Sequence, residues 1–163
     1  MKFCLIDRIV ELQSGQSIKA IKNLSLAEEY LQDHFPGFPV MPGVLQVEAL
    51  VQTGAWLMRE AEQFKYSTVL LKEVKAVRFN NFVAPGKTLE VECVVHKREE
   101  RLYTFKATGQ VDGGSTINAR ITLEQFNLSD NHPDLGRSDE MRIGKLREQF
   151  GILWPAGTGS QPG

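Results

Sequence analysis

Two side chains that can exchange protons lie near each other in the first third of the chain. His34 opens a segment with three prolines, and Glu48 lies in the apolar run that follows. An imidazole titrates near neutral pH, so His34 can accept a proton. Apolar surroundings disfavour a charged carboxylate, so we expect a raised pKa that keeps Glu48 protonated as a donor. Alone, His34 could be an ordinary loop histidine and Glu48 a helix-end ion pair, but together they favour acid–base chemistry.

A third chemical element comes from the backbone between these residues. Pro42 suits the first position of a helix, and the N–H groups of Gly43 and Val44 then fall in its unsatisfied first turn. The positive end of the helix dipole and two free N–H donors can hold a developing oxyanion. Base, acid and oxyanion donors are what a β-elimination beside a carbonyl group requires.

The elements that must position these groups are one long helix and an antiparallel sheet. From Pro42 to Phe64 the chain is apolar nearly all round, which predicts a buried helix of about 22 residues. A hairpin is expected over 3–24, a stiff loop over 25–41 and a strand at about 67–80, and alternating segments at 89–95, 103–108 and 117–124 predict three more strands. The sequence therefore predicts an α+β fold, with an antiparallel sheet wrapped around one long central helix.

The C-terminal part has a different character from the rest. We expect one domain over 1–127 and an extension over 128–163. Within the extension, Ser138 can cap a short helix at about 138–150, and Ile143, Leu146 and Phe150 give that helix an apolar docking stripe. The Gly- and Pro-containing tail has nothing to bury, so we expect it to be disordered.

Charge, hydropathy and cysteine content exclude several classes of protein. Nineteen Lys and Arg against twenty Asp and Glu give a net charge of −1, which does not favour nucleic-acid binding. No apolar run reaches the ~18 residues of a membrane span. Cys4 and Cys93 form no disulfide framework, which favours a reducing cytoplasm. The histidines have no metal-ligand spacing, so no metal site is expected.

The segment from His34 to Gln52, HFPGFPVMPGVLQVEALVQ, resembles the active-site segment of the 3-hydroxyacyl-[acyl-carrier-protein] dehydratases of bacterial fatty-acid synthesis, a hotdog-fold family. The pairs Asp7-Arg8 and Lys22-Asn23 and the stretch 77–86 are also similar to the family pattern. The resemblance covers roughly residues 3–125 and includes the His-to-Glu interval, three prolines and two glycines. It is far more specific than a single glycine motif.

The resemblance implies a role for each matching residue. His34 would remove the C2 proton of a (3R)-3-hydroxyacyl thioester, and Glu48 would protonate the departing 3-hydroxyl group, leaving a trans-2-enoyl product. Gln52 would orient Glu48. The backbone N–H groups of Gly43 and Val44 would hold the thioester oxygen. In the family, the histidine and the glutamate of one site come from different subunits.

The family also implies partners. Its members form homodimers, often assembled as trimers of dimers, and take their substrate from the phosphopantetheine arm of acyl carrier protein, without a metal or redox cofactor. Residues 72–106 carry a local excess of basic side chains. We expect Arg78 to be the contact for an acidic carrier, although an ordinary solvated surface explains these charges equally well.

Two other functions remain open on the sequence alone. A hotdog acyl-thioesterase would use Glu48 to activate water and would need no histidine base. A non-catalytic hotdog subunit would bind acyl chains or pair with an active partner. The proline-rich loop that carries His34 speaks against the first, and the presence of both His34 and Glu48 speaks against the second.

Overall fold

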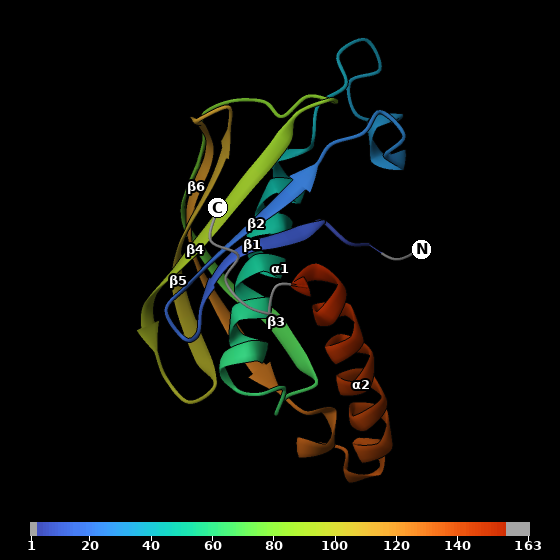
Figure 1. Cartoon of the computed structure of the whole chain (residues 1–163), viewed down its shortest axis with the longest axis vertical. Coiled ribbons are helices and arrows are strands. Elements are labelled where there is room, and N and C mark those ends of the chain that lie inside the picture. Colours follow the sequence, from blue (N-terminus) through green and yellow to red (C-terminus); the bar gives the residue numbers. More distant parts are fainter. Residues whose placement is uncertain (1–2, 156–163) are drawn as a thin grey trace.

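The computed structural model describes residues 3–155, which form a curled sheet around one helix with a second helix outside it (Figure 1). The strands are β1 (Arg8–Gln13), β2 (Ser17–Asn23), β3 (Thr68–Phe79), β4 (Thr88–Arg98), β5 (Leu102–Val111) and β6 (Gly114–Phe126). They form one sheet in the order β1-β2-β4-β5-β6-β3, and all neighbours are antiparallel. The predicted α+β architecture is confirmed.

The sheet has two edges of different length. β1 is a six-residue strand, whereas β3 has twelve residues and most of its side chains are exposed. Inside the sheet, the hairpin between β5 and β6 turns at Asp112 and Gly113, with φ values of 50° and 78°. Two successive positive φ angles are typical of a tight hairpin turn, which explains the Asp-Gly pair.

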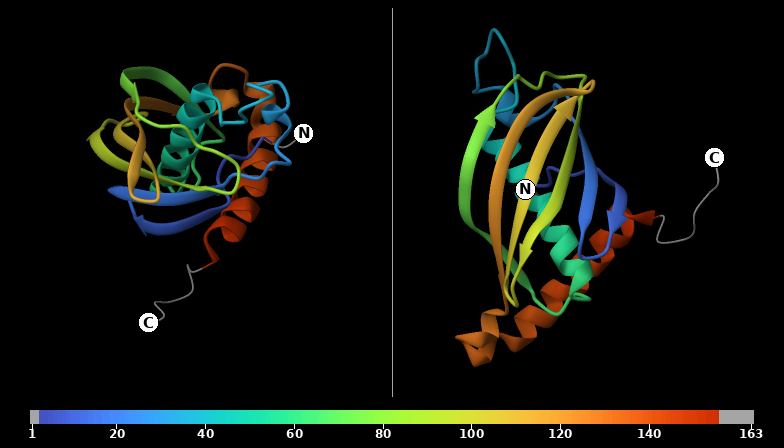
Figure 2. Two further views of the ribbon diagram at one scale, coloured as in Figure 1. Left: turned by 90° about the horizontal axis from the view of Figure 1, so that it is seen from above. Right: turned by 90° about the vertical axis from the view of Figure 1, so that its left-hand side faces the viewer.

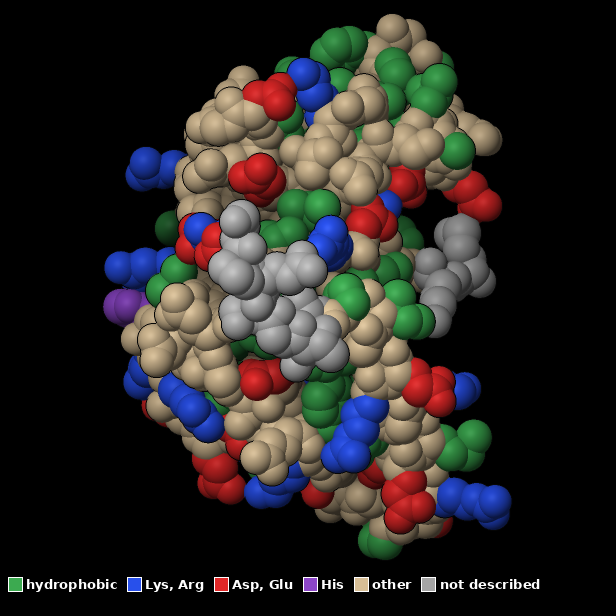
Figure 3. Space-filling view, viewed as in Figure 1, with side chains coloured by type: hydrophobic (Ala, Val, Ile, Leu, Met, Phe, Trp, Pro, Cys, Tyr) green, Lys and Arg blue, Asp and Glu red, His purple; other side chains and the backbone are tan. Residues whose placement is uncertain are grey.

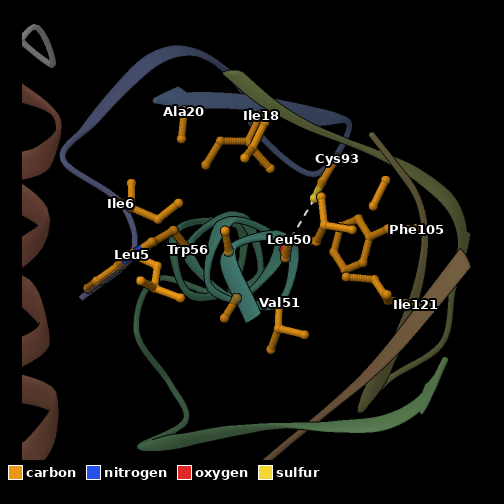
Figure 4. Close-up of a cluster of buried hydrophobic side chains, with 14 of the residues drawn as sticks. Leu5, Ile6, Ile18, Ala20, Leu50, Val51, Trp56, Cys93, Phe105 and Ile121 are labelled. Atoms are coloured by element: carbon orange, nitrogen blue, oxygen red, sulfur yellow. Dashed lines mark hydrogen bonds between the residues drawn. The ribbon is translucent and has the colours of Figure 1, made fainter. Parts of the chain in front are cut away.

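Helix α1 (Gly43–Ala61) fills the concave face of the sheet, as Figures 2 and 4 show. Leu50, Leu57 and Met58 are fully buried. The core strands point apolar side chains toward the helix, and the thiol of Cys93 on β4 donates a hydrogen bond to the carbonyl oxygen of Leu50 at 3.4 Å. Burial raises the pKa of the Cys93 thiol. The apolar pattern thus places α1 at the centre of the core.

The ends of α1 differ from the sequence prediction. Pro42 precedes the helix as its N-cap residue, with ψ of 139°, and Gly43 is the first helical residue. The helix ends at Ala61, earlier than expected, because Gln63 and Phe64 take positive φ values of 52° and 59°. The N–H of Phe64 then bonds to the carbonyl oxygen of Arg59 at 2.7 Å, which closes the last turn.

The C-terminal extension begins with two short 3-10 turns, η2 (Leu128–Asp130) and η3 (Pro133–Leu135), followed by helix α2 (Gly136–Leu153). The helix starts two residues before Ser138, so the prediction that Ser138 caps it was wrong. Its neighbour Asp139 is buried and accepts hydrogen bonds from the hydroxyl group of Ser67 and from the backbone N–H groups of Leu128 and Ser129, the latter two at 3.0 and 2.9 Å. One carboxylate therefore joins α2 to η2 and to the start of β3.

Helix α2 lies along the side of α1 that the sheet leaves open (Figures 1 and 2). The ring of Phe150 packs against Trp56 and Phe64 of the α1 region, with centroids 6.0 and 5.4 Å apart. Leu146 also packs against the core. The tail that we expect to be disordered covers 155–163, and all of it after Pro155 lies outside the described residues.

Within residues 3–155, no helix has both the length and the apolarity needed to cross a lipid bilayer. On the face seen in Figure 3, acidic and basic side chains are interspersed, and hydrophobic side chains gather at the top, over the loop between β2 and α1. That loop carries exposed Phe35 and Phe38.

We predict that Asp139→Ala lowers the free energy of unfolding by about 2 kcal/mol, because the buried hydroxyl of Ser67 and two half-buried backbone N–H groups lose their acceptor. Burial acts to raise the pKa of Asp139, but the hydrogen bonds from Ser67, Ser129 and Leu128 outweigh it and hold the pKa below its ordinary value. This stabilisation is therefore complete above pH ~4 and is lost as the pH falls further. Denaturant unfolding from pH 7 down to pH 3 measures the effect, with exposed Glu140→Ala as the control. Equal stability of the two variants at pH 7 would contradict the prediction.

Candidate active site

The loop that carries His34 is held at both ends. It follows the short turn η1 (Glu29–Leu31), and the N–H of Met41 at its far end donates to the carbonyl oxygen of Val83 at 2.8 Å. Phe35 has a φ of 52°, and it precedes Pro36, which disfavours the right-handed helical region for the residue before it. Positive φ at a residue other than glycine is uncommon and is often found at functional sites.

His34 faces a cavity of about 360 Å³, which we call the histidine cavity. This volume lies within the usual range of small-molecule sites, ~300–1,000 Å³. The cavity lies between the loop, the first turn of α1 and the end of β3, and its lining includes His34, Val40, Gly43, Gln46, Phe79 and Asn81.

The first turn of α1 contributes Gly43 to the same cavity. The N–H groups of Leu45 and Gln46 both donate to the carbonyl oxygen of Pro42, at 2.9 and 3.2 Å. Within residues 3–155, the N–H groups of Gly43 and Val44 have no acceptor, as the first turn of a helix leaves them. A Cβ atom on Gly43 would lie 2.8 Å from Cε1 of Phe79, so glycine permits the close approach of β3 to these donors.

Glu48 and Gln52 lie one turn apart on α1 and contact each other. The side-chain N–H of Gln52 donates to Oε1 of Glu48 at 3.1 Å and to the carbonyl oxygen of Phe3 at 3.2 Å. Oε1 of Gln52 accepts the N–H of Leu5 at 2.8 Å. The amide is thus held from both ends by the segment that precedes β1, and this fixes the direction from which it reaches Glu48.

Glu48 is half-buried, so the expectation of a carboxyl group enclosed by apolar residues was wrong for the single chain. The sheet covers only part of α1, and the face with Glu48 and Gln52 borders a second cavity of about 240 Å³. This glutamate cavity lies between α1, Val69 of β3 and helix α2, and His34 does not line it. The structure therefore brings His34 together with Gly43, and Glu48 together with Gln52, but places the two groups in different cavities of one chain.

Arg78 is exposed on edge strand β3, where it pairs across the sheet with Asn118. It does not line the histidine cavity, although its neighbour Phe79 does. Within residues 3–155, no acidic side chain forms an ion pair with Arg78. Its position near the cavity is compatible with the docking role expected from the sequence.

Sequence reasoning missed three amide side chains at the histidine cavity: Gln46, Asn80 and Asn81. Gln46 is only 3% exposed, and within the described residues its Oε1 atom has no hydrogen-bond partner. The side-chain N–H groups of Asn80 and Asn81 bond to Ser115 at 2.8 and 3.1 Å, which holds the turn after β3 against β6. A polar residue two positions before Glu48, in an otherwise apolar stretch, is the signal that could have identified Gln46.

Comparisons with known proteins agree on the class of molecule. Residues 1–120 match the family model described as a FabA-like domain. The chain is 41% identical over 119 residues to the 3-hydroxyacyl-[acyl-carrier-protein] dehydratase FabZ of Latilactobacillus sakei, covering 73% of this chain and 85% of that protein. It is 37% identical over 136 residues to the FabZ of a Janthinobacterium species, covering 82% and 87%.

Solved structures with low sequence identity share the fold. The dehydratase heterocomplex ApeI:P from Xenorhabdus doucetiae aligns with a TM-score of 0.66 at 16% identity, covering 82% of this chain and 90% of that chain. A mutant thioesterase from Pseudomonas aeruginosa aligns with a TM-score of 0.57 at 14% identity, covering 73% and 80%. These likenesses confirm the hotdog fold.

We predict that Gln52→Leu lowers kcat roughly ten- to hundredfold and leaves KM within about twofold, because Glu48 loses the contact that orients it. Initial rates of turnover by the enzyme, in a reaction that uses Glu48, measure kcat and KM. Thermal unfolding measures whether the variant is as stable as the wild type. Gln63→Leu, a change at an exposed glutamine just past α1, is the matched control. A parallel loss of kcat and of folded protein would show that Gln52 only supports the fold.

Proposed function

The chain belongs to the FabA-like domain family, and from this membership we propose that it dehydrates 3-hydroxyacyl-[acyl-carrier-protein] to 2-enoyl-[acyl-carrier-protein] in fatty-acid synthesis. The supporting observation is a pair of half-sites beside α1, with His34 of the preceding loop and the free N–H donors of the first turn at one cavity, and Glu48 with Gln52 at the other. The dehydratase names of the curated relatives favour this reaction over thioester hydrolysis and over a non-catalytic subunit.

The geometry of β3 supports assembly of the site from two chains. β3 is a long edge strand with exposed Leu70 and Leu71, and such an edge needs a cover. Phe79, at the end of β3, lines the histidine cavity, and Val69, near its start, lines the glutamate cavity. If two copies pair antiparallel through β3, the histidine cavity of one chain faces the glutamate cavity of the other. We therefore propose a homodimer with two shared sites; dimers could associate further, as trimers of dimers.

The chemistry follows from these positions. The imidazole of His34 takes the C2 proton, and the electron pair of that C–H bond forms the C2–C3 double bond. The C3–O bond breaks, and the carboxyl group of Glu48 from the second chain gives its proton to the departing oxygen, which leaves as water. The N–H groups of Gly43 and Val44 hold the negative charge that develops on the thioester oxygen.

The substrate carrier and the compartment are further parts of the proposal. The side-chain oxygens of Asn80 and Asn81, whose N–H groups are already bonded, can accept hydrogen bonds from the amides of a phosphopantetheine arm. Acid, base and oxyanion donors balance the reaction, so the proposed mechanism requires no metal or redox cofactor. Free Cys4 and Cys93 support a reducing cytoplasm.

We predict that His34→Ala and Glu48→Gln each lower kcat about 10²–10⁴-fold, because each removes one partner of proton transfer. Loss of 3-hydroxyacyl carrier protein and formation of the 2-enoyl product are followed together. Retention of more than a tenth of the wild-type rate by either variant would exclude the assigned role.

Mixing the two inactive variants tests whether the site is shared. After subunit exchange, half of the dimers contain one chain of each kind, and each of these has one intact site, so about a quarter of wild-type activity returns. Each variant alone is the control. No recovery after exchange, verified by mass spectrometry, would count against a site shared between chains.

For carrier docking, we predict that Arg78→Glu raises KM for carrier-bound substrate several-fold and spares a short pantetheine thioester. An acidic carrier is attracted by exposed positive charge, and this attraction weakens as salt is raised. Arg142→Glu, the same charge change at an exposed position on α2, is the matched control. Equal effects on both substrates would place the docking surface elsewhere.

A further inference from the structure

Helix α2 forms one side of the glutamate cavity. Leu146 and Gln149 of α2 line it, opposite Val51 and Trp56 of α1. We propose that α2 limits the length of acyl chain that the site accepts, because it forms one wall of the cavity that runs from Glu48 toward Arg59 and narrows the space beside that path. This inference rests on the proposed function, because it takes the acyl part of the substrate as the occupant.

The composition of the cavity fits an alkyl chain. Beyond Glu48 and Gln52, its lining includes apolar side chains from three elements: Val51, Ala55, Trp56, Val69 and Leu146. A substrate whose C3 oxygen meets Glu48 has the rest of its acyl chain next to that carboxyl group. The adjoining apolar space is therefore where the chain would continue.

The glutamate cavity extends along one face of α1. Glu48, Gln52, Ala55 and Arg59 all line it, at spacings that place them on one face of α1. Glu48 and Arg59 are about three turns apart, or ~16 Å along the helix axis at ~1.5 Å per residue. A chain that starts at Glu48 and follows this face leads toward Arg59.

Arg59 marks the end of the apolar path. Its guanidinium group lies over the ring of Trp56, 4.8 Å from the centroid. Its buried Nε atom has no hydrogen-bond partner within residues 3–155, and burial lowers its pKa to about 10. If the methyl end of the acyl chain extended further, it would displace water from the guanidinium group of Arg59. Removing water from a cation that already lacks a hydrogen-bond partner is unfavourable. The acyl chain should therefore stop short of Arg59.

Helix α2, which forms one wall of the glutamate cavity, is held in place by contacts with the α1 region and with Cys4. Phe150 packs on Trp56 and Phe64, and the side-chain N–H of Gln149 donates to the Cys4 thiol at 3.6 Å. This helix lies outside the residues that match the FabA-like domain, 1–120. The length limit would then be a property that this chain adds to the family's domain.

The test is a chain-length series of 3-hydroxyacyl carrier proteins, assayed for kcat/KM with the wild-type chain, Leu146→Ala and Leu146→Trp. We expect Leu146→Ala to raise the ratio of long-chain to short-chain kcat/KM about tenfold, and Leu146→Trp to lower it by a similar factor. The opposite directions separate a change of cavity from a loss of folded enzyme. Met141→Ala, on the same helix but 59% exposed, is the matched control and should leave the profile unchanged.

The outcomes separate the two proposals. If the wild-type chain dehydrates no member of the series, the proposed function fails and the length limit fails with it. If the wild-type chain is active and both Leu146 variants keep its profile, only the role of α2 is overturned. A shift in opposite directions supports it.

Discussion

The burial of α1 against the concave face of the sheet fixes the direction of the side chains at both cavities. Residues two positions apart on a helix point to nearly opposite sides, so Gln46 and Glu48 cannot serve the same cavity of one chain. Apolar contacts around Leu50 and Leu57 leave the helix no freedom to rotate. The division of the site into halves is therefore a direct result of core packing.

Sequence patterns predicted the elements well because each depends on local spacing. The apolar run after Pro42, the alternating strands and the Asp112-Gly113 turn all carry their own signal. The errors arose where contacts between distant parts of the chain decide the outcome. Asp139, which follows Ser138, is bonded to Ser67 within a helix that already begins at Gly136. The half-burial of Glu48 depends on how far the sheet curls around α1. The segment from His34 to Gln52 pointed to His34, Glu48 and Gln52 as site residues. The spacing of residues along one chain does not show that His34 faces one cavity while Glu48 and Gln52 face another.

The position of β3 at the edge of the sheet links stability to the proposed chemistry. The strand borders both cavities and also leaves exposed hydrophobic side chains that need a cover. Antiparallel pairing of β3 with the β3 strand of a second copy would remove this apolar surface from water and complete two sites. A chain kept apart from a second copy could thus be well folded around α1 and still lack an acid opposite its base.

The two cysteines differ in a way that makes the chain easy to label. Cys93 is fully buried, and its thiol donates a hydrogen bond to the carbonyl oxygen of Leu50. Its raised pKa disfavours the reactive thiolate. Cys4 is only partly covered and lies against Gln149 of α2. An alkylating fluorophore would therefore attach first at Cys4, without any engineered cysteine. Its emission would report the docking of α2 beside the glutamate cavity in real time.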